Sequence, residues 1–210
     1  MKRMKRTLIS MIAFLGLGLW LLPSTTRAQQ QLVIKPLAER KVSDLPAGEL
    51  FWRIEKFATL ARAQAAAGPW GLAAESAGKD WLFTLGPAGE SSPGGTEFAE
   101  VGPIPRVAAP QYLLRINEAS GSPGSITSVH MHPGSEAFYV LDGEQSIRTP
   151  RGVMRVEVGQ SEAGSGAETP MQVSSTGSTE LHALVMFVVD ATKPFSSPAK
   201  FPETQERQMN

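Results

Sequence analysis

Two histidines and a glutamate lie close together in the sequence and could jointly bind a metal ion. His130 and His132 are separated by one residue in an apolar stretch that we predict to be a strand, so their side chains project from the same face. Residues 133–135 turn the chain, and Glu136 begins the returning strand, where its carboxylate can lie beside the two imidazoles. Two imidazoles and one carboxylate with open positions are typical ligands of non-haem iron, and the same set also binds manganese, zinc or copper.

Glu136 has a second candidate role, as a general base in a site that holds no metal. Burial in an apolar barrel would raise the pKa of its carboxyl group, as a base that works near neutral pH requires. Metal coordination would oppose that shift. The hydroxyl groups of Tyr112 and Tyr139 are candidates for hydrogen bonds to a ligand, but both residues also fit the core.

The elements that would position these residues are short strands. From about Gln111 onward, runs of Val, Ile, Leu, Phe and Tyr alternate with Gly, Pro and Ser clusters, which is typical of an antiparallel sandwich or barrel. Met154, Val156 and Val158 alternate with charged residues and predict one buried face. The predicted strands cover residues 112–117, 126–132, 137–141, 145–148, 153–158, 171–174 and 181–189.

The preceding segment has a different pattern. Residues 50–57 and 81–85 are apolar and predict strands, and the Ala-rich residues 58–67 predict one short helix. We therefore expect residues 29–109 to form an N-terminal α/β extension that packs on the barrel. Three tryptophans are expected to anchor its core, namely Trp52, Trp70 and Trp81. The sequence assigns this extension no function.

The first 28 residues have the pattern of a secretory signal peptide. Four basic residues precede an apolar run over residues 8–22, and Thr26 and Ala28 fit a cleavage site after residue 28. The run is shorter than the roughly 20 residues that span a bilayer, so we expect cleavage rather than an anchor. The mature chain, residues 29–210, is then periplasmic or secreted and has no membrane span.

The mature chain is acidic. Removal of residues 1–28 leaves 15 basic against 20 acidic residues, without a Lys/Arg cluster, so we expect no nucleic acid partner. The chain has no cysteine, which excludes disulfides and thiolate metal ligands. Its length suits one domain with an extension.

The spacing around the two histidines resembles the first signature motif of the cupins. Gly124, His130, His132, Glu136 and Gly143 occupy every fixed position of that motif. The resemblance implies a mainly β fold, with a cupin barrel over residues 110–192 that is a jelly-roll-like double-stranded β-helix enclosing the site. Residues 193–210 are expected to be an extended or disordered C-terminal tail.

The second cupin motif is incomplete in this chain. Gly166, Glu168, Met171 and Ser175 stand where the family has Pro, Gly, His and Asn, so Met171 replaces the family's last ligand. Its thioether either adds a soft ligand that favours Cu(I) or only fills the barrel, and the barrel could also have lost its metal. His182 is a candidate substitute ligand, although a one-residue change in register would turn it outward.

Three functions stay open at this stage. The first is an exported protein that binds one transition metal ion, copper, iron or manganese, through His130, His132 and Glu136, with Met171 or His182 as further candidate ligands. The second, which the resemblance implies, is a metal-dependent dioxygenase or decarboxylase acting on a small organic acid or phenolic compound. The third is a metal-free cupin that binds a small ligand. The resemblance also implies a homodimer, and a shared fold does not by itself choose among these functions.

Overall fold

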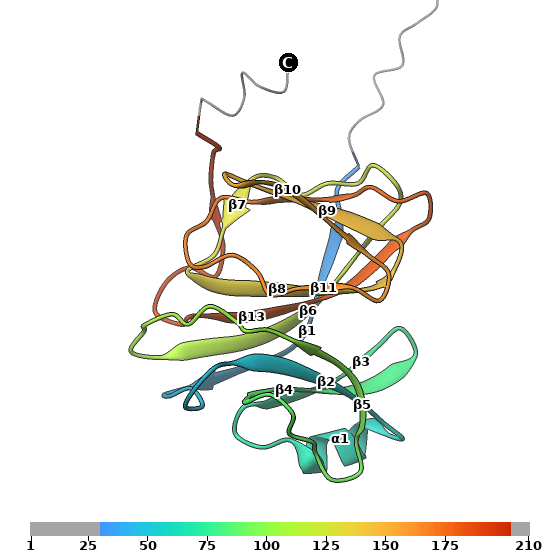
Figure 1. Cartoon of the computed structure of the whole chain (residues 1–210), viewed down its shortest axis with the longest axis vertical. Helices are drawn as coiled ribbons and strands as arrows, with labels where there is room; N and C mark the ends of the chain where they lie inside the picture. The colour runs from blue at the N-terminus through green and yellow to red at the C-terminus, as the bar shows by residue number, and fades with distance from the viewer. Residues whose placement is uncertain (1–29, 203–210) are drawn as a thin grey trace, which may run out of the picture.

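The structure, a computed structural model, describes residues 30–202 of the 210-residue chain (Figure 1). The predicted signal peptide, residues 1–28, lies outside the described part, as do residues 203–210. The described part is built almost entirely of strands, and α1 (Leu60–Ala66) is the single helix within it. No helix between residues 30 and 202 is long and apolar enough to cross a membrane.

One sheet of the barrel is built around β13, which is an almost continuous apolar run because both of its faces are covered. Its odd-numbered residues from Leu181 to Val189 belong to the core inside the barrel, and its even-numbered residues from Leu184 to Val188 belong to the core on the other side. The strand order is β1-β6-β13-β8-β11, with antiparallel neighbours. These strands are β1 (Val33–Val42), β6 (Tyr112–Gly121), β8 (Gly134–Asp142), β11 (Ser161–Glu162) and β13 (Leu181–Asp190).

The opposite wall of the barrel has the order β10-β9-β12 and continues to β7 through a bridge between His130 and Met171. Its strands are β7 (His130–Met131), β9 (Glu144–Thr149), β10 (Gly152–Glu157) and β12 (Gln172–Ser175), and β14 (Ser197–Pro198) pairs with the outer edge of β7. The two walls therefore have the orders 6-13-8-11 and 7-12-9-10. This is the order of an eight-stranded jelly roll, and it confirms the predicted double-stranded β-helix.

A second core lies between the barrel and the N-terminal four-stranded sheet, which has the order β3-β4-β2-β5 (Figure 1). Trp52 and Trp81 are fully buried in this core and pack with the outward-facing residues of β13. Trp70 is partly buried against it, and its indole N–H donates to the Asp44 carbonyl at 3.0 Å. The elements of this sheet are β2 (Phe51–Phe57), β3 (Gly71–Ser76), β4 (Lys79–Gly86) and β5 (Thr96–Val101), with α1 against them.

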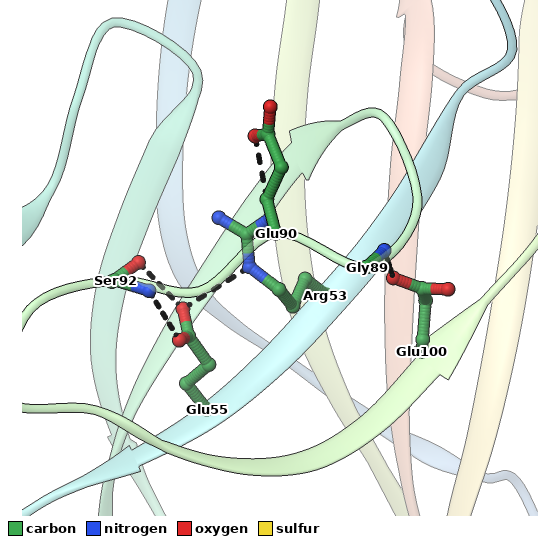
Figure 2. Close-up of polar contacts among 6 residues, drawn as sticks. All are labelled: Arg53, Glu55, Gly89, Glu90, Ser92 and Glu100. Carbon is green, nitrogen blue, oxygen red and sulfur yellow. Dashed lines mark hydrogen bonds and ion pairs between the residues drawn. The ribbon is translucent and has the colours of Figure 1, made fainter.

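The loop between β4 and β5 covers an ion pair on the other face of this sheet (Figure 2). Arg53 and Glu55 leave β2 on the same side, are 5% and 0% exposed, and have 3.4 Å between Nε and Oε2. Ser92 in the loop donates its backbone N–H to the Glu55 carboxylate at 2.7 Å and its hydroxyl at 2.6 Å. Glu90 lies 3.6 Å from the Arg53 guanidinium. The loop thus fixes both charges of the pair.

Two predicted strands differ from the structure. Of residues 126–132, only His130 and Met131 form a strand, because the Thr127 hydroxyl accepts a hydrogen bond from the Val173 N–H in place of a regular ladder contact. The predicted buried face of residues 153–158 is confirmed only at its centre. Val156 is buried, but Met154 is 39% exposed because β10 ends the sheet and has only β9 beside it. Val158 is 60% exposed because the strand ends at Glu157 and Val158 lies in the turn that follows.

Candidate metal centre

His130, His132 and Glu136 come together inside the barrel. Each offers one ligand atom, and these atoms lie within 4.8 Å of one another. His130 belongs to β7, His132 follows that strand directly, and Glu136 is the third residue of β8. The connection is shorter than the predicted turn over residues 133–135, because β8 already begins at Gly134. The chain therefore assembles these three residues into a group that can hold a metal ion.

Both imidazoles are oriented through Nδ1. The Nδ1 of His130 lies 2.9 Å from the Ser128 carbonyl, and the Nδ1 of His132 lies 2.6 Å from the Phe195 carbonyl. A carbonyl oxygen only accepts, so Nδ1 carries the proton in both rings and Nε2 keeps its lone pair. Metal-binding histidines commonly donate their second ring N–H to such an acceptor, which fixes the tautomer and the ring orientation.

Glu136 is the most unusual group of the three. Its side chain is 6% exposed, and its Oε2 has no hydrogen-bond partner among the described residues although it lies 3.6 Å from the His132 Nε2. Burial raises the pKa of Glu136 to about 8. Burial also lowers the pKa of His132 to about 4, against the opposing effect of its hydrogen bond to Phe195. Near neutral pH, both groups are therefore uncharged in the metal-free protein.

The three residues line a pocket of about 300 Å³. Most of its wall comes from apolar side chains of the barrel, among them Phe138, Val185 and Phe187. Asn117 and the first residues of the described chain, including Gln31, add polar groups to the wall. A concave site with apolar walls and a few convergent polar groups suits a small molecule.

The C-terminal segment covers the histidines. The Phe195 ring lies 4.8 Å from the His132 ring and 4.9 Å from the Phe187 ring, and the Arg115 guanidinium lies 4.4 Å from the Phe195 ring. β14 then pairs with β7, and Phe201 is buried. Residues 193–202 are thus extended, one of the two alternatives expected for the tail, and they are ordered because their backbone and aromatic groups pack on the site.

Met171 lies directly across from His130. The His130 N–H donates to the Met171 carbonyl at 3.0 Å and the Met171 N–H donates to the His130 carbonyl at 2.8 Å, so the two side chains share the inner face. Met171 is 2% exposed in the barrel core and does not line the pocket. Glu168 has a φ of 58°, which glycine adopts without strain, in agreement with its place at the glycine position of the second motif. Ligation by Met171 stays a prediction.

His182 is separated from the group of three. It lies on β13 with the even-numbered residues, whose face is opposite to the barrel interior. Its side chain is 37% exposed, and its Nε2 lies 4.0 Å from a carboxylate oxygen of Glu180. The strand register places this ring on the outer face of the sheet. A register shifted by one residue would have placed it inside the barrel. Tyr139 likewise packs into the outer core, and neither Tyr139 nor Tyr112 lines the pocket.

Three further residues of the site, Arg115, Asn117 and Phe195, were not predicted from the sequence. Arg115 and Asn117 lie two residues apart in a predicted strand and therefore share a face. This is the inner face, because Ala119, two residues further on, belongs to the barrel core. Two polar residues on one face of an otherwise apolar strand were the available signal. Phe195 gave no such signal, because it holds the His132 ring through its backbone carbonyl, a group that every residue has.

No protein-family model matches the chain, and no curated protein matches it. Several solved structures are similar to part of it. A conserved protein of unknown function from Streptococcus pyogenes is 25% identical, with a TM-score of 0.33 over 37% of this chain and 64% of that one. A cupin-like protein from Thermotoga maritima is 16% identical, with a TM-score of 0.37 over 45% and 71% of the two chains.

A third similar structure is salicylate 1,2-dioxygenase from Pseudoaminobacter salicylatoxidans. It is 18% identical, with a TM-score of 0.32 over 35% of this chain and 19% of that one. The chain thus spans less than two thirds of the first of the three structures and about a fifth of the dioxygenase. The fold assignment follows from the strand order of the barrel itself.

Proposed function

We propose that this chain, whose barrel has the cupin fold, binds one transition metal ion through His130, His132 and Glu136. The observation that carries the proposal is the buried Oε2 of Glu136, which has no hydrogen-bond partner among residues 30–202 and faces the Nε2 of His132. A buried polar atom without a partner is costly to the folded protein. A cation bound to this atom and to the two Nε2 lone pairs would remove that cost.

The ligand chemistry fits a first-row transition metal. Two imidazole nitrogens and one carboxylate oxygen suit iron, manganese or copper, and the number of open positions leaves room for water or a substrate. A bound ion would supply Lewis acidity or redox chemistry at the wall of the pocket. The protein's own contribution is to hold both rings by their Nδ1 protons, to supply the charge of ionised Glu136, and to exclude water with Phe187 and Phe195.

Copper would be favoured if the Met171 thioether joined the ligands, because sulfur selects Cu(I). Met171 lies on the same inner face as His130, but its place in the barrel core also fits a purely packing role. The nitrogen and oxygen set without sulfur favours iron or manganese. We therefore take the three pocket-lining residues as the ligands and leave Met171 as a candidate fourth.

A catalytic role is the second candidate, and the pocket beside the cluster favours it. Its volume of about 300 Å³ and its apolar walls would accommodate a small organic acid or phenolic compound next to the metal. We accordingly extend the proposal to a metal-dependent dioxygenase or decarboxylase acting on such a compound. Cleavage after residue 28, a periplasmic or secreted location and a homodimer are further parts of the proposal.

Metal content tests the binding proposal. We would express residues 29–210 without an affinity metal, load the protein with Fe(II), Mn(II) or Cu(II), remove the excess and count retained ions by mass spectrometry. We expect about one ion per chain in the wild type and less than about a tenth of that in the H130A/H132A double variant. H182A is the matched control, because His182 lies outside the cluster, and it should retain as much metal as the wild type.

Two outcomes would contradict the proposal. Equal metal content in the wild type and the H130A/H132A variant would show that the ion binds elsewhere. A folded wild type that retains no ion after stoichiometric loading would favour a metal-free small-ligand-binding protein instead.

A further inference from the structure

Asn117 is the one buried amide in the pocket that contains the metal cluster. It lies on β6, its exposed fraction is 1%, and it lines the same pocket as His130, His132 and Glu136. Asn117 pairs with Val185 on β13, and Val185 pairs with Phe138 on β8, two residues along from Glu136. The side chain therefore faces the barrel interior from a position diagonal to Glu136.

Arg115 fixes which way the amide of Asn117 points. The Arg115 Nε–H donates to the Asn117 Oδ1 at 2.9 Å. A rotated amide would instead point its NH₂ group at the guanidinium, and two donors cannot form a hydrogen bond. Arg115 is itself held by Glu39, with 3.5 Å between Nη1 and Oε2, and by the ring of Phe195.

The Asn117 amide is left with an unused donor. Its Oδ1 accepts from Arg115, and its Nδ2 has no hydrogen-bond acceptor within the described chain. Nδ2 is not completely enclosed by protein atoms. Because Asn117 lines the pocket, the accessible side of Nδ2 faces the pocket. The pocket wall contains neither Lys nor Arg, and the Arg115 guanidinium behind it is engaged by Asn117, Glu39 and the Phe195 ring. The Asn117 Nδ2 is therefore a fixed neutral donor at this wall.

We infer that Asn117 orients a ligand of the metal centre by donating an Nδ2–H hydrogen bond to one of its oxygen atoms, and that Arg115 is the positioning residue for this donor. The inference rests on the proposed metal site and names its ligand class. The ligand is a small molecule with an apolar body and a carboxylate, carbonyl or phenolic oxygen. Phosphorylated compounds are disfavoured, because the wall offers no cationic side chain to a doubly charged group.

The sequence offers a selective probe, because Asn117 and Asn210 are the only asparagines. Protein labelled with ¹⁵N in the asparagine side chains should show two NH₂ pairs in a proton–nitrogen correlation spectrum, and the N117D variant identifies the pair from Asn117. We would load the protein with diamagnetic zinc, confirm the zinc content by mass spectrometry, and titrate with benzoate. The Asn117 pair should shift on titration, whereas the Asn210 pair should not.

Affinity measurements separate the hydrogen bond from the shape of the pocket. N117D keeps the size of the side chain but presents an oxygen where Nδ2 was, so benzoate should bind about 10- to 100-fold more weakly to the zinc-loaded variant. Pyridine binds a metal through nitrogen and has no acceptor oxygen, so its affinity should change less than about twofold. R115M leaves the amide free to rotate and should weaken benzoate binding by about 3- to 10-fold with a smaller shift of the Asn117 pair.

The possible failures are distinguishable. Zinc loading that fails in the wild type refutes the metal site on which the inference rests. Zinc-loaded wild type that does not bind benzoate, or whose Asn117 pair does not move on binding, overturns the inference while leaving the metal site intact. Equal benzoate affinity in the wild type and N117D also overturns the inference. If N117D does not fold, the titration of the wild type alone tests whether Asn117 contacts the ligand.

Discussion

Two buried glutamates on opposite sides of the molecule are treated differently by their surroundings. Glu55, on the outer face of the four-stranded sheet, is fully buried, and its carboxylate contacts Arg53 and accepts two hydrogen bonds from Ser92 (Figure 2). Glu136, inside the barrel, is almost as buried, but its Oε2 has no hydrogen bond. Its ion-pair neighbour is His132, which burial keeps neutral near pH 7. The chain itself supplies a counter-charge and hydrogen-bond donors to the Glu55 carboxylate, whereas it leaves the Glu136 Oε2 without a partner among the described residues.

The difference shows how to separate structural from functional buried charges. A carboxylate retained for structure acquires a counter-charge and donors from its own chain, since an unpaired buried charge is costly. A carboxylate retained for binding must leave part of its coordination free, and its raised pKa reports that missing partner. The following experiments test this comparison.

The largest effect is expected from removal of the Glu55 carboxylate. E55A leaves the guanidinium of Arg53 buried without its main counter-charge, so the free energy of unfolding should fall by about 3–5 kcal/mol. Chemical denaturation of the metal-free protein measures this change. E97A is the matched control, because Glu97 lies opposite Glu55 but is exposed, and it should stay within about 0.5 kcal/mol of the wild type. An E55A variant as stable as E97A would contradict the structural role of Glu55.

A smaller effect is expected from pH in the metal-free protein. The folded-state pKa of Glu136 is raised from 4.5 to about 8, so its contribution to stability is complete below pH 4.5 and is lost as the pH rises through 8. The folded-state pKa of His132 is lowered from 6.5 to about 4, so its contribution is complete above pH 6.5 and is lost as the pH falls toward 4. Between pH 6.5 and 8 only the Glu136 effect acts, and stability should fall by about 2 kcal/mol.

Denaturation curves at several pH values measure this slope, and E136Q is its control. A glutamine has no carboxyl proton to lose, so the stability of E136Q should be nearly flat between pH 6.5 and 8. Metal-loaded wild type should also lose the slope, because the ionised carboxylate is then bound. A wild type and an E136Q variant with the same slope would show that Glu136 is not the open carboxylate we describe.

The smallest effect is expected from Glu90, the second carboxylate near Arg53. Its side chain is 60% exposed and lies 3.6 Å from the guanidinium, so solvent screens the interaction. E90Q should change the free energy of unfolding by less than about 0.5 kcal/mol in the same denaturation assay. A loss comparable to that of E55A would mean that the loop, rather than Glu55, supplies the main counter-charge for Arg53.

The sequence predicts the barrel well because its strands repeat a simple pattern. The apolar runs between Tyr112 and Val189 are each bounded by turn residues, and their buried positions follow the two-residue period of a strand. Edges are harder, because burial there depends on which strands lie alongside. Met154 and Val158 have the pattern of core residues, but Met154 lies on the edge strand β10 and Val158 in the turn after it, where no neighbour covers them.

The three residues of the cluster are predictable because their spacing is local, whereas the rest of the site depends on distant pairings. His182 fits a ligand by residue type, and only the register of β13 with β6 places it on the outer face. Asn117 and Phe195 reach the pocket from segments far from His132 in sequence. A single sequence does not specify such contacts.

The pairing of the His132 ring with the Phe195 carbonyl, across 63 positions of sequence, also bears on when the site can become complete. Translation proceeds from the N-terminus, so the ribosome releases His130, His132 and Glu136 well before the segment that holds the His132 ring. The N-terminal sheet completes its own strand pairing at Val101, although its core also packs against the late residues of β13. A nascent chain therefore carries the three candidate ligands before it has an oriented site, and we expect the proposed metal ion to bind only to the finished protein.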